Sequence, residues 1–344
     1  MKILLVIPSW PNLSGVDYHR LWAPHNRMTE DISAINEIDS RDEDFIKQFD
    51  IIVANRFISR TGNAQAVIDK LKRADVPYVL DMDDDYTLPS DHILSSHHRQ
   101  KNYAEQILLA CKHAYLVTTT HERLGEDIKK KVRTPYWIVP NGIDPKEDQF
   151  KVREALVDKV TFGWSGSITH FDDVFMLHDA LYSLYLSSLD FKMVYGGYDS
   201  TDTTSQGIAG ILSCKGKANP NQFSYIPSDT VLNYARFYDY INCMLIPLKD
   251  NRFNSMKSNL KLLEAGFKKK AVICSDVHPY ADLLTDSNSI KISSKKEWYN
   301  AMKYLITKPW EIDLLAEQLY LDVQEFHIDN ITQKRLEAYK WCLA

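Results

Sequence analysis

The sequence has 344 residues, which predicts two domains because a typical domain takes about 100–200 residues. Hydrophobic residues make up 44% and charged residues 25%, with 12 glycines and 13 prolines, and this usage excludes a disordered or fibrous protein. The net charge of −5 argues against a chain-wide basic surface for gripping nucleic acid.

Short apolar runs alternate with amphipathic stretches along the chain, which is typical of βαβ units and a parallel sheet. In the first half, strands are expected within residues 2–9, 49–56, 77–85 and 134–144. Helices are expected over 16–28, 63–75 and 122–132, and residues 106–120 predict a helix followed by a strand. This half forms one doubly wound unit that ends near residue 150.

A second unit of the same kind follows. Strands are expected within 159–167, 191–200, 241–250 and 271–276, and helices over 172–188, within 224–239, and over 256–269 and 296–308. The predicted fold class is therefore α/β, with two Rossmann-like domains facing a cleft, residues 1–150 and 151–310, and a helical segment over 311–344. Ligands of such sheets bind at the carboxyl ends of the strands, so the site is expected in the strand-to-helix loops.

The most informative stretch is FNSMKSNLKLLEAG, residues 253–266. If Lys257 and Ser258 open a helix, its N-terminal amides and positive dipole end suit a diphosphate. Lys257 and Lys261 then share a face, and Glu264 lies one turn further in, where it can accept hydrogen bonds from ribose or sugar hydroxyls. The alternative is an amphipathic surface helix with solvated lysines.

The turn GWSGS, residues 163–167, follows the first strand of the second half. Gly166 and Ser167 allow a ligand to approach the backbone closely, and His170, Asp172 and Asp173 follow within one turn. The turn lacks the dinucleotide fingerprint GxGxxG, so it gives no support to NAD binding.

An acidic run, LDMDDDYTLP, follows a predicted strand at residues 80–89. It suits a divalent metal, a general base for an acceptor hydroxyl, or a solvated turn that caps the next helix. Because strand side chains alternate, Asp81 and Asp83 share a face and Asp84 lies on the other, so one or two of these carboxylates are expected in the site.

Basic residues near two strand ends in the first half, Arg20 and Arg56, fit anion recognition or an ion pair with the acidic run. Gly15 ends the loop after the first strand. Five cysteines lie far apart without zinc-ligand spacing, which indicates reduced thiols and a cytoplasmic protein. The chain has no run of about 20 apolar residues, so no transmembrane segment is expected, and its N-terminus reads as a buried strand, not a signal peptide.

Together these segments resemble the GT-B glycosyltransferases, in particular the GT4-like branch (glycosyl transferases group 1) of phage and bacterial type. The resemblance rests on four blocks: GVDYHRLWAP, VLDMDDDYTLP, VPNGID followed by FGWSGSITHFDD, and PLKDNRFNSMKSNLKLLEAG followed by ICSDVHPY. The last block is the most specific, with Phe253, Asn254, Lys257, Ser258, Lys261 and Glu264 matching the pattern of such sequences.

The resemblance implies a metal-independent sugar transfer from a nucleotide-diphosphate sugar, with retention of the anomeric configuration, a UDP-sugar favoured as donor and no further cofactor. Donor-binding residues would be Gly15, Arg20, Gly166, Ser167, Asn254, Lys257, Ser258, Lys261 and Glu264. The catalytic residues would be Asp83, Asp84, His170 and Glu264, with the acceptor on the N-terminal domain and the donor on the C-terminal domain. The segment from Trp310 onward would pack back on the first half. The resemblance also implies that the protein acts in the cytoplasm of a bacterium or of a phage-infected host.

Two departures from the family pattern leave the stereochemistry open. Met256 stands at the first position of the usual E-x7-E motif, and SITHFDD occupies the place of an Arg/Lys pair. An acidic base at Asp83 or Asp84 would suit inversion just as well.

The resemblance implies that the acceptor is either a glycan or a hydroxymethylated phage DNA base. The basic clusters KKKVR (129–133) and FKKK (267–270) leave room for a local nucleic-acid groove, although such clusters are more often solvated faces. Two other functions stay open: a nucleotide-sugar epimerase of the same fold, and a catalytically silent nucleotide-sugar-binding module.

Overall fold

The computed structural model describes residues 1–92 and 94–344, which form two compact units. Unit 1 comprises Met1–Gly142, Met256–Ser258 and Phe326–Ala344, and unit 2 comprises Ile143–Ser255 and Asn259–Glu325. The sequence analysis places its boundaries at 150 and 310 instead. Within the described ranges, no helix is long and apolar enough to cross a membrane.

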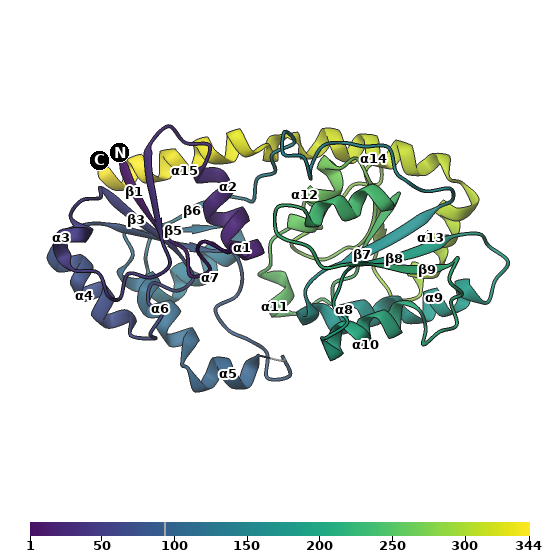
Figure 1. Ribbon diagram of the computed structural model, residues 1–344, viewed down its shortest axis with the longest axis horizontal. Coiled ribbons are helices and arrows are strands. Elements are labelled where there is room, and N and C mark those ends of the chain that lie inside the picture. Colours follow the sequence, from purple (N-terminus) through teal and green to yellow (C-terminus); the bar gives the residue numbers. More distant parts are fainter. Residues whose placement is uncertain (93) are drawn as a thin grey trace. The chain divides into compact units, whose positions relative to one another are not determined.

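Unit 1 is built on a six-stranded parallel sheet with the strand order β2-β1-β3-β4-β5-β6 (Figure 1). Its strands alternate along the chain with helices, which is the connection that parallel strands require. The strands are β1 (Lys2–Val6), β2 (Asp31–Ile35), β3 (Ile51–Asn55), β4 (Tyr78–Met82), β5 (Leu116–Thr119) and β6 (Tyr136–Ile138). Strands β3, β4 and β5 are buried along their whole length, as expected for central strands covered on both faces.

The helices of unit 1 begin and end at recognisable caps. Asn63 caps α4, Asp75 ends it in the left-handed region, and His121 caps α7. A π-helical turn, Tyr18–Trp22, joins the short helices α1 (Gly15–Asp17) and α2 (Ala23–His25). The remaining helices are α3 (Glu43–Ile46), α4 (Ala64–Ala74), α5 (Ser95–Gln100), α6 (Tyr103–His113), α7 (Glu122–Val132) and α15 (Ile328–Leu343).

Helix α15 completes unit 1 although it comes from the far end of the sequence. It lies beside α2 (Figure 1), and its Ala338, Tyr339 and Cys342 pack in a cluster with the β1 residues Ile3 and Leu5. The unit therefore depends on a segment that the chain adds only after unit 2.

Unit 2 contains a second six-stranded parallel sheet, with the order β12-β11-β10-β7-β8-β9. Its strands are β7 (Thr161–Ser165), β8 (Lys192–Tyr198), β9 (Phe223–Pro227), β10 (Cys243–Ile246), β11 (Ala271–Ser275) and β12 (Ile290–Ile292). The chain winds outward from β7 to β9 and then returns to β10 on the other side of β7. The order in which successive strands are added to the sheet thus reverses between β7 and β10.

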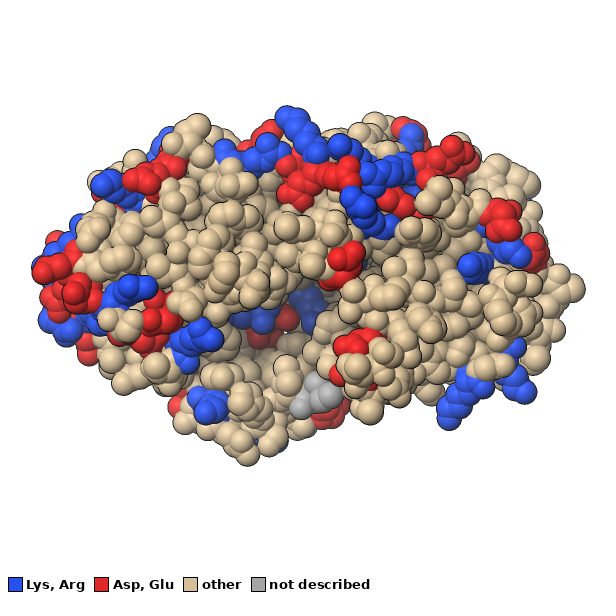
Figure 2. All heavy atoms as spheres, viewed as in Figure 1, with Lys and Arg blue, Asp and Glu red and all other residues tan. Residues whose placement is uncertain are grey.

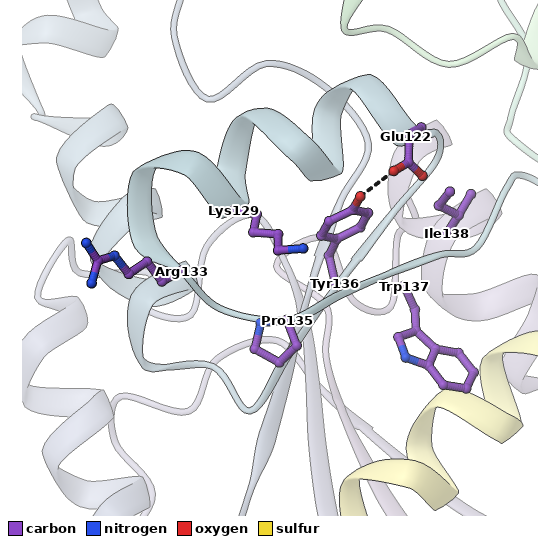
Figure 3. A pocket seen from close by; sticks show the side chains of 7 residues that line it. All are labelled: Glu122, Lys129, Arg133, Pro135, Tyr136, Trp137 and Ile138. Carbon is purple, nitrogen blue, oxygen red and sulfur yellow. Dashed lines mark hydrogen bonds between the residues drawn. The ribbon is translucent and has the colours of Figure 1, made fainter.

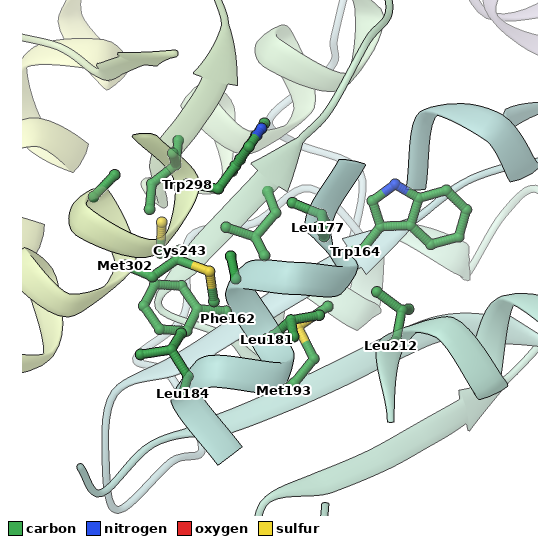
Figure 4. Packing of buried hydrophobic residues seen from close by; sticks show 14 of the residues in the cluster. Phe162, Trp164, Leu177, Leu181, Leu184, Met193, Leu212, Cys243, Trp298 and Met302 are labelled. Atoms are coloured by element: carbon green, nitrogen blue, oxygen red, sulfur yellow. The ribbon is translucent and has the colours of Figure 1, made fainter. Parts of the chain in front are cut away.

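Helices cover both faces of the unit 2 sheet, with α12 and α14 on one side and α8, α9 and α10 on the other (Figure 1). Their bounds are α8 (Phe171–Val174), α9 (His178–Tyr185), α10 (Thr203–Leu212), α11 (Arg252–Ser255), α12 (Leu260–Phe267), α13 (Glu297–Thr307) and α14 (Trp310–Asp322), with 3-10 turns at Ile168–His170, Phe175–Leu177, Tyr234–Tyr240 and Val323–Phe326. Figure 4 shows part of the core beneath them, where Phe162 and Met193 of the sheet pack against Leu181 of α9.

The α/β fold class is confirmed, most of the predicted strands and helices are found, and helix α7 has the predicted bounds. The helix expected within 224–239 is wrong, since strand β9 begins this segment and a 3-10 turn, Tyr234–Tyr240, follows it. The sequence analysis missed three strands at the edges of the sheets, β2, β9 and β12. It also missed the helices α3, α5 and α10. The helix expected over 256–269 begins later than predicted, at Leu260 with Asn259 as its N-cap residue. Lys257 and Ser258 therefore precede the helix and do not form its first turn.

Candidate functional site

The strand order of unit 2 identifies one edge of its sheet as the place for a ligand. A crevice opens in such sheets at the carboxyl ends of the two strands where the order reverses, here β7 and β10. The loop after β7 carries Gly166, Ser167 and His170, and the loop after β10 leads to Asn254 and then to α12. Residues that the sequence analysis selected from two distant motifs thus come from neighbouring strand ends.

Lys261, in the first turn of α12, reaches the loop after β7. Its Nζ lies 5.3 Å from the ring centroid of the buried Trp164, and a Cβ added to Gly166 would be only 2.7 Å from that nitrogen. The ammonium group is thus held against the glycine backbone by an aromatic face. This arrangement brings together a cation, the first turn of α12 and the glycine-containing loop after β7.

His170 and Asn254 meet at a shared carboxylate. His170 Nδ1 lies 2.8 Å from Asp173 Oδ2, and Asn254 donates from Nδ2 to Asp173 Oδ1 at 3.1 Å. Asn254 is buried, so it supports the loop after β7 from the interior of the unit through Asp173. Ser167 is exposed and caps the following turn by accepting a hydrogen bond from Thr169 N.

Glu264 lies one turn beyond Lys261 and is 5% exposed. Its two carboxylate oxygens accept hydrogen bonds from two phenols, Tyr234 and, at 3.0 Å, Tyr238. Burial raises the pKa of Glu264 to about 6, although both phenols and the charge of Lys261 act to lower it. Glu264 is therefore a buried acceptor oriented by tyrosines, and the sequence analysis did not select those tyrosines.

Met256, Lys257 and Ser258 belong to unit 1. Met256 is 5% exposed in the apolar cluster of that unit, and His121 Nε2 donates to its carbonyl at 3.2 Å. Lys257 Nζ lies 3.6 Å from Asp84 Oδ2. These contacts hold the segment out of α12, so the prediction that Lys257 and Lys261 share one helix face is wrong. Ser258 is partly buried.

The acidic run divides into carboxylates with different surroundings. Asp83 accepts two hydrogen bonds from Arg56, at 2.8 and 2.9 Å. Burial opposes ionisation of Asp83, but the Arg56 guanidinium outweighs it and lowers the pKa of the carboxyl. Asp84 Oδ2 lies further from its cations, at 3.6 Å from Lys257 and 3.8 Å from Arg56. Asp84 is consequently less tightly held than Asp83.

Arg20 occupies a buried position in unit 1. Its Nε and Nη2 each donate to Asp81 at 2.8 Å, and its Nη1 donates to Asn141 at 3.1 Å. All three guanidinium nitrogens are thus engaged inside the unit. Of the two roles considered from the sequence, anion recognition or an ion pair with the acidic run, Arg20 has the second. Gly15, at the start of α1, is exposed, and a Cβ added there would meet no atom within 4 Å.

The two basic clusters differ from each other. In FKKK, Lys268 and Lys270 are buried and only Lys269 is exposed, so this cluster is not the solvated face or the nucleic-acid groove considered from the sequence. In KKKVR, Lys129 and Arg133 line a surface pocket of about 550 Å³ with Trp137 (Figure 3). On the face seen in Figure 2, acidic and basic side chains are interspersed.

Two comparisons by sequence return no match, since neither a protein-family model nor a curated protein resembles the chain significantly. Solved structures do resemble it. HepE of Anabaena, in complex with UDP-glucose, aligns with a TM-score of 0.71 at 13% identity, over 99% of this chain and 100% of HepE. A glycosyltransferase of Rickettsia africae aligns with a TM-score of 0.68 at 12% identity, over 99% and 98% of the two chains.

A third similar structure is the sucrose-phosphate synthase of Thermosynechococcus elongatus, with a TM-score of 0.65 at 12% identity, over 86% of this chain and 74% of that one. All three are GT-B glycosyltransferases. This likeness, which extends over nearly the whole chain, shows that the protein has the GT-B fold.

Proposed function

We propose that this chain of GT-B fold is a glycosyltransferase that moves a sugar from a nucleoside-diphosphate sugar to an acceptor hydroxyl. Unit 2 binds the donor and unit 1 binds the acceptor. The observation that carries the proposal is the group of residues at the β7/β10 edge of unit 2, where Lys261, Gly166 and His170 come from neighbouring loops.

The chemistry of that edge suits a diphosphate. The Lys261 ammonium and the exposed turn after β7 supply positive charge and close backbone approach, and Ser167 adds a hydroxyl. As the bond from the sugar C1 to the β-phosphate oxygen breaks, its electron pair passes to that oxygen. Fixed cations stabilise the developing charge without reorganisation, and we propose that they do so without a metal.

Glu264 would accept hydrogen bonds from ribose or sugar hydroxyls, in a carboxylate already oriented by Tyr234 and Tyr238. A UDP-sugar is the favoured donor, because the solved structures of similar fold include HepE with UDP-glucose. The donor itself is then the only co-substrate besides the acceptor.

On the acceptor side, Asp84 is a better candidate than Asp83 for contact with the reacting hydroxyl, since Arg56 holds Asp83 through two hydrogen bonds. If Asp84 takes the hydroxyl proton as the acceptor oxygen bonds to C1, the reaction inverts the configuration. Retention, which the resemblance implies, requires attack on the face of the leaving phosphate. The anomeric configuration of the first product, read by NMR, distinguishes the two.

We favour a glycan over a modified DNA base as the acceptor, because two of the four residues in FKKK are buried lysines and the net charge is −5. Glycans and hydroxymethylated DNA compared side by side as acceptors test this preference. Transfer to DNA alone would reverse it.

A thermal-shift panel of UDP, GDP, ADP, CMP and TDP tests the donor site. A ligand present at 100 times its Kd stabilises the folded protein by about 2.7 kcal/mol. We expect UDP to raise the Tm of the wild type and of Lys303→Ala, an exposed lysine on α13 of the same unit, but not of Lys261→Ala. A shift that survives in Lys261→Ala would refute the proposed donor site.

Two other functions give different results in the same assays. An epimerase would change the sugar of the donor with no acceptor present, which NMR of the donor alone would reveal. A binding module would show the Tm shift but release no UDP with any acceptor.

A further inference from the structure

Asp173 is a buried carboxylate at which three segments of unit 2 meet. It is 4% exposed and lies in α8, after β7. His170 Nδ1 lies 2.8 Å from Asp173 Oδ2, while Oδ1 accepts hydrogen bonds from Lys249 N at 2.9 Å and Asn254 Nδ2 at 3.1 Å. The loop after β7, the loop after β10 and helix α11 are therefore tied to one side chain.

This contact determines how His170 can meet a ligand. Because a carboxylate accepts hydrogen bonds, Nδ1 of His170 carries the proton and donates it to Asp173. Any contact of the ring with a donor molecule then goes through Nε2. The His170 side chain is 12% exposed, so the ring is partly shielded from water and lies against a buried carboxylate.

Other charged groups surround the pair. Burial acts to raise the pKa of Asp173, but the hydrogen bond and charge of His170, the Lys249 amide and the charge of Lys261 together lower it. The Lys249 side chain extends to Asp172, with Nζ at 3.9 Å from its carboxylate. The negative charge of Asp173 also contributes to the raised pKa of the buried Tyr280, after burial itself. Asp173 is therefore ionised at neutral pH and available as the counter-charge of an imidazolium.

We propose that Asp173 is a positioning residue that directs Nε2–H of a protonated His170 at the donor diphosphate, where the imidazolium supplies positive charge to the departing phosphate. The proposal rests on the function proposed above and adds a residue to it. No covalent bond to His170 forms, because the ring only donates a hydrogen bond. His170 thereby supplies charge where the sequence SITHFDD replaces the Arg/Lys pair of similar enzymes.

The test is the pH dependence of kcat for the wild type, His170→Gln and Asp173→Asn. We expect His170→Gln to lower kcat by on the order of 100-fold and to abolish the alkaline decline of the wild-type profile. Asp173→Asn should lower kcat about tenfold and move that decline to lower pH by about one unit or more, because the imidazolium loses its carboxylate.

A second His–Asp pair in unit 2 provides the matched control. His178 Nδ1 lies 3.1 Å from Asp179 Oδ1 at the start of α9, outside the loops after β7 and β10. His178→Gln and Asp179→Asn should leave both kcat and the profile unchanged. If Asp173→Asn loses activity but keeps the wild-type profile, Asp173 has a structural role and the proposal is wrong.

Two further measurements separate the possible failures. His170→Gln keeps the bonds of Asp173 to Lys249 and Asn254, so an alkaline decline that persists in this variant overturns the proposal even if Asp173→Asn does not fold. The ring-nitrogen NMR shifts of His170 in the wild type should show the proton on Nδ1 at high pH, and a proton on Nε2 would also overturn it. Wild-type protein that neither binds UDP nor turns over any UDP-sugar refutes the proposed function instead.

Discussion

At the scale of single residues, Lys261 approaches Gly166 closely in unit 2. A methyl group on Gly166 would lie 2.7 Å from Lys261 Nζ, the end of a flexible side chain, and 3.1 Å from Cζ2 of Trp164, so the ammonium has to move and the ring has to shift slightly. We therefore expect Gly166→Ala to keep the Tm of the wild type within a few degrees. Displacement of the ammonium should weaken UDP binding about tenfold, as one lost charge-assisted contact does.

Titration calorimetry with UDP measures this effect. Gly210→Ala on α10 is the control, because a Cβ there meets no atom within 4 Å. Unchanged UDP affinity in Gly166→Ala would mean that the contact of Lys261 with this loop plays no part in binding.

Glu264 should give unit 2 a pH-dependent stability of unusual sign. Its folded pKa of about 6 lies above its ordinary value of 4.5, so between these pH values the folded state binds more protons than the unfolded state. Its contribution to the free energy of unfolding is therefore fully present below pH 4.5, falls by about 1 kcal/mol between pH 4.5 and 6, and is lost by about 2 kcal/mol in all once the pH has passed well above 6. Glu264→Gln should lack this fall.

Urea unfolding of the wild type and Glu264→Gln between pH 4 and 7 checks the sign. The difference between the two should grow in favour of the variant as the pH rises through this range. Glu154→Gln, at an exposed position in the same unit, should run parallel to the wild type. A constant difference between wild type and Glu264→Gln would contradict the raised pKa.

At the scale of elements, the buried Lys268 at the end of α12 binds the segment 149–151, near the start of unit 2. Lys268 Nζ donates to the carbonyls of Gln149 and Lys151, at 2.9 and 2.8 Å, and lies 2.7 Å from Asp239. Methionine in its place leaves two carbonyls and a carboxylate without that partner. We expect Lys268→Met to lower the free energy of unfolding by about 3–5 kcal/mol.

The adjacent lysine provides the control in denaturant unfolding. Lys269 is exposed and pairs with the exposed Glu317, so Lys269→Met should change stability by less than about 1 kcal/mol. Equal effects of the two substitutions would show that the buried contacts of Lys268 contribute little.

The sequence predicted the elements where the apolar pattern is strong. The strands β3, β4 and β10 coincide with continuous apolar runs, which are typical of buried parallel strands. Helix α7 coincides with an amphipathic run of helical period. It failed at β2, which is only half-buried, and at the start of α12. No local pattern could reveal that Met256 is packed in unit 1, because that contact depends on residues far away in the sequence.

The candidate site was predicted unevenly for a related reason. The spacing of Lys261 and Glu264 is a property of one helix and could be read from the sequence. The partners of these side chains could not, since Trp164, Tyr234 and Asp173 lie in other elements. The same holds for Arg20, whose use inside unit 1 follows from its distance to Asp81 and not from its position after β1.

At the scale of the whole molecule, Asp81 joins the two ends of unit 1. It is fully buried, and it accepts hydrogen bonds from Arg20 near the start of the chain and, at 3.1 Å, from Arg335 on α15. The two guanidinium groups share this carboxylate. Asp81→Asn should therefore destabilise the protein by about 3–5 kcal/mol, because it leaves buried cations without their counter-charge.

Thermal and urea unfolding followed by circular dichroism measure this loss. Glu43→Gln removes a carboxylate from a solvent-accessible pair, in which Arg73 is exposed and Glu43 half-exposed, and should cost less than about 1 kcal/mol. An Asp81→Asn protein as stable as the Glu43→Gln protein would mean that the buried pairs do not hold α15 in place.

The return of the chain to unit 1 has a consequence for the order in which the protein forms during translation. Unit 2 can collapse as soon as its own residues have left the ribosome, but unit 1 lacks Arg335 and the apolar face of α15 until the segment Phe326–Ala344 emerges. The half that is made first is thus the half that is finished last. Until then Asp81 lacks one of its two cations, and a nascent chain stalled before this segment should expose the β1 face to proteases and chaperones.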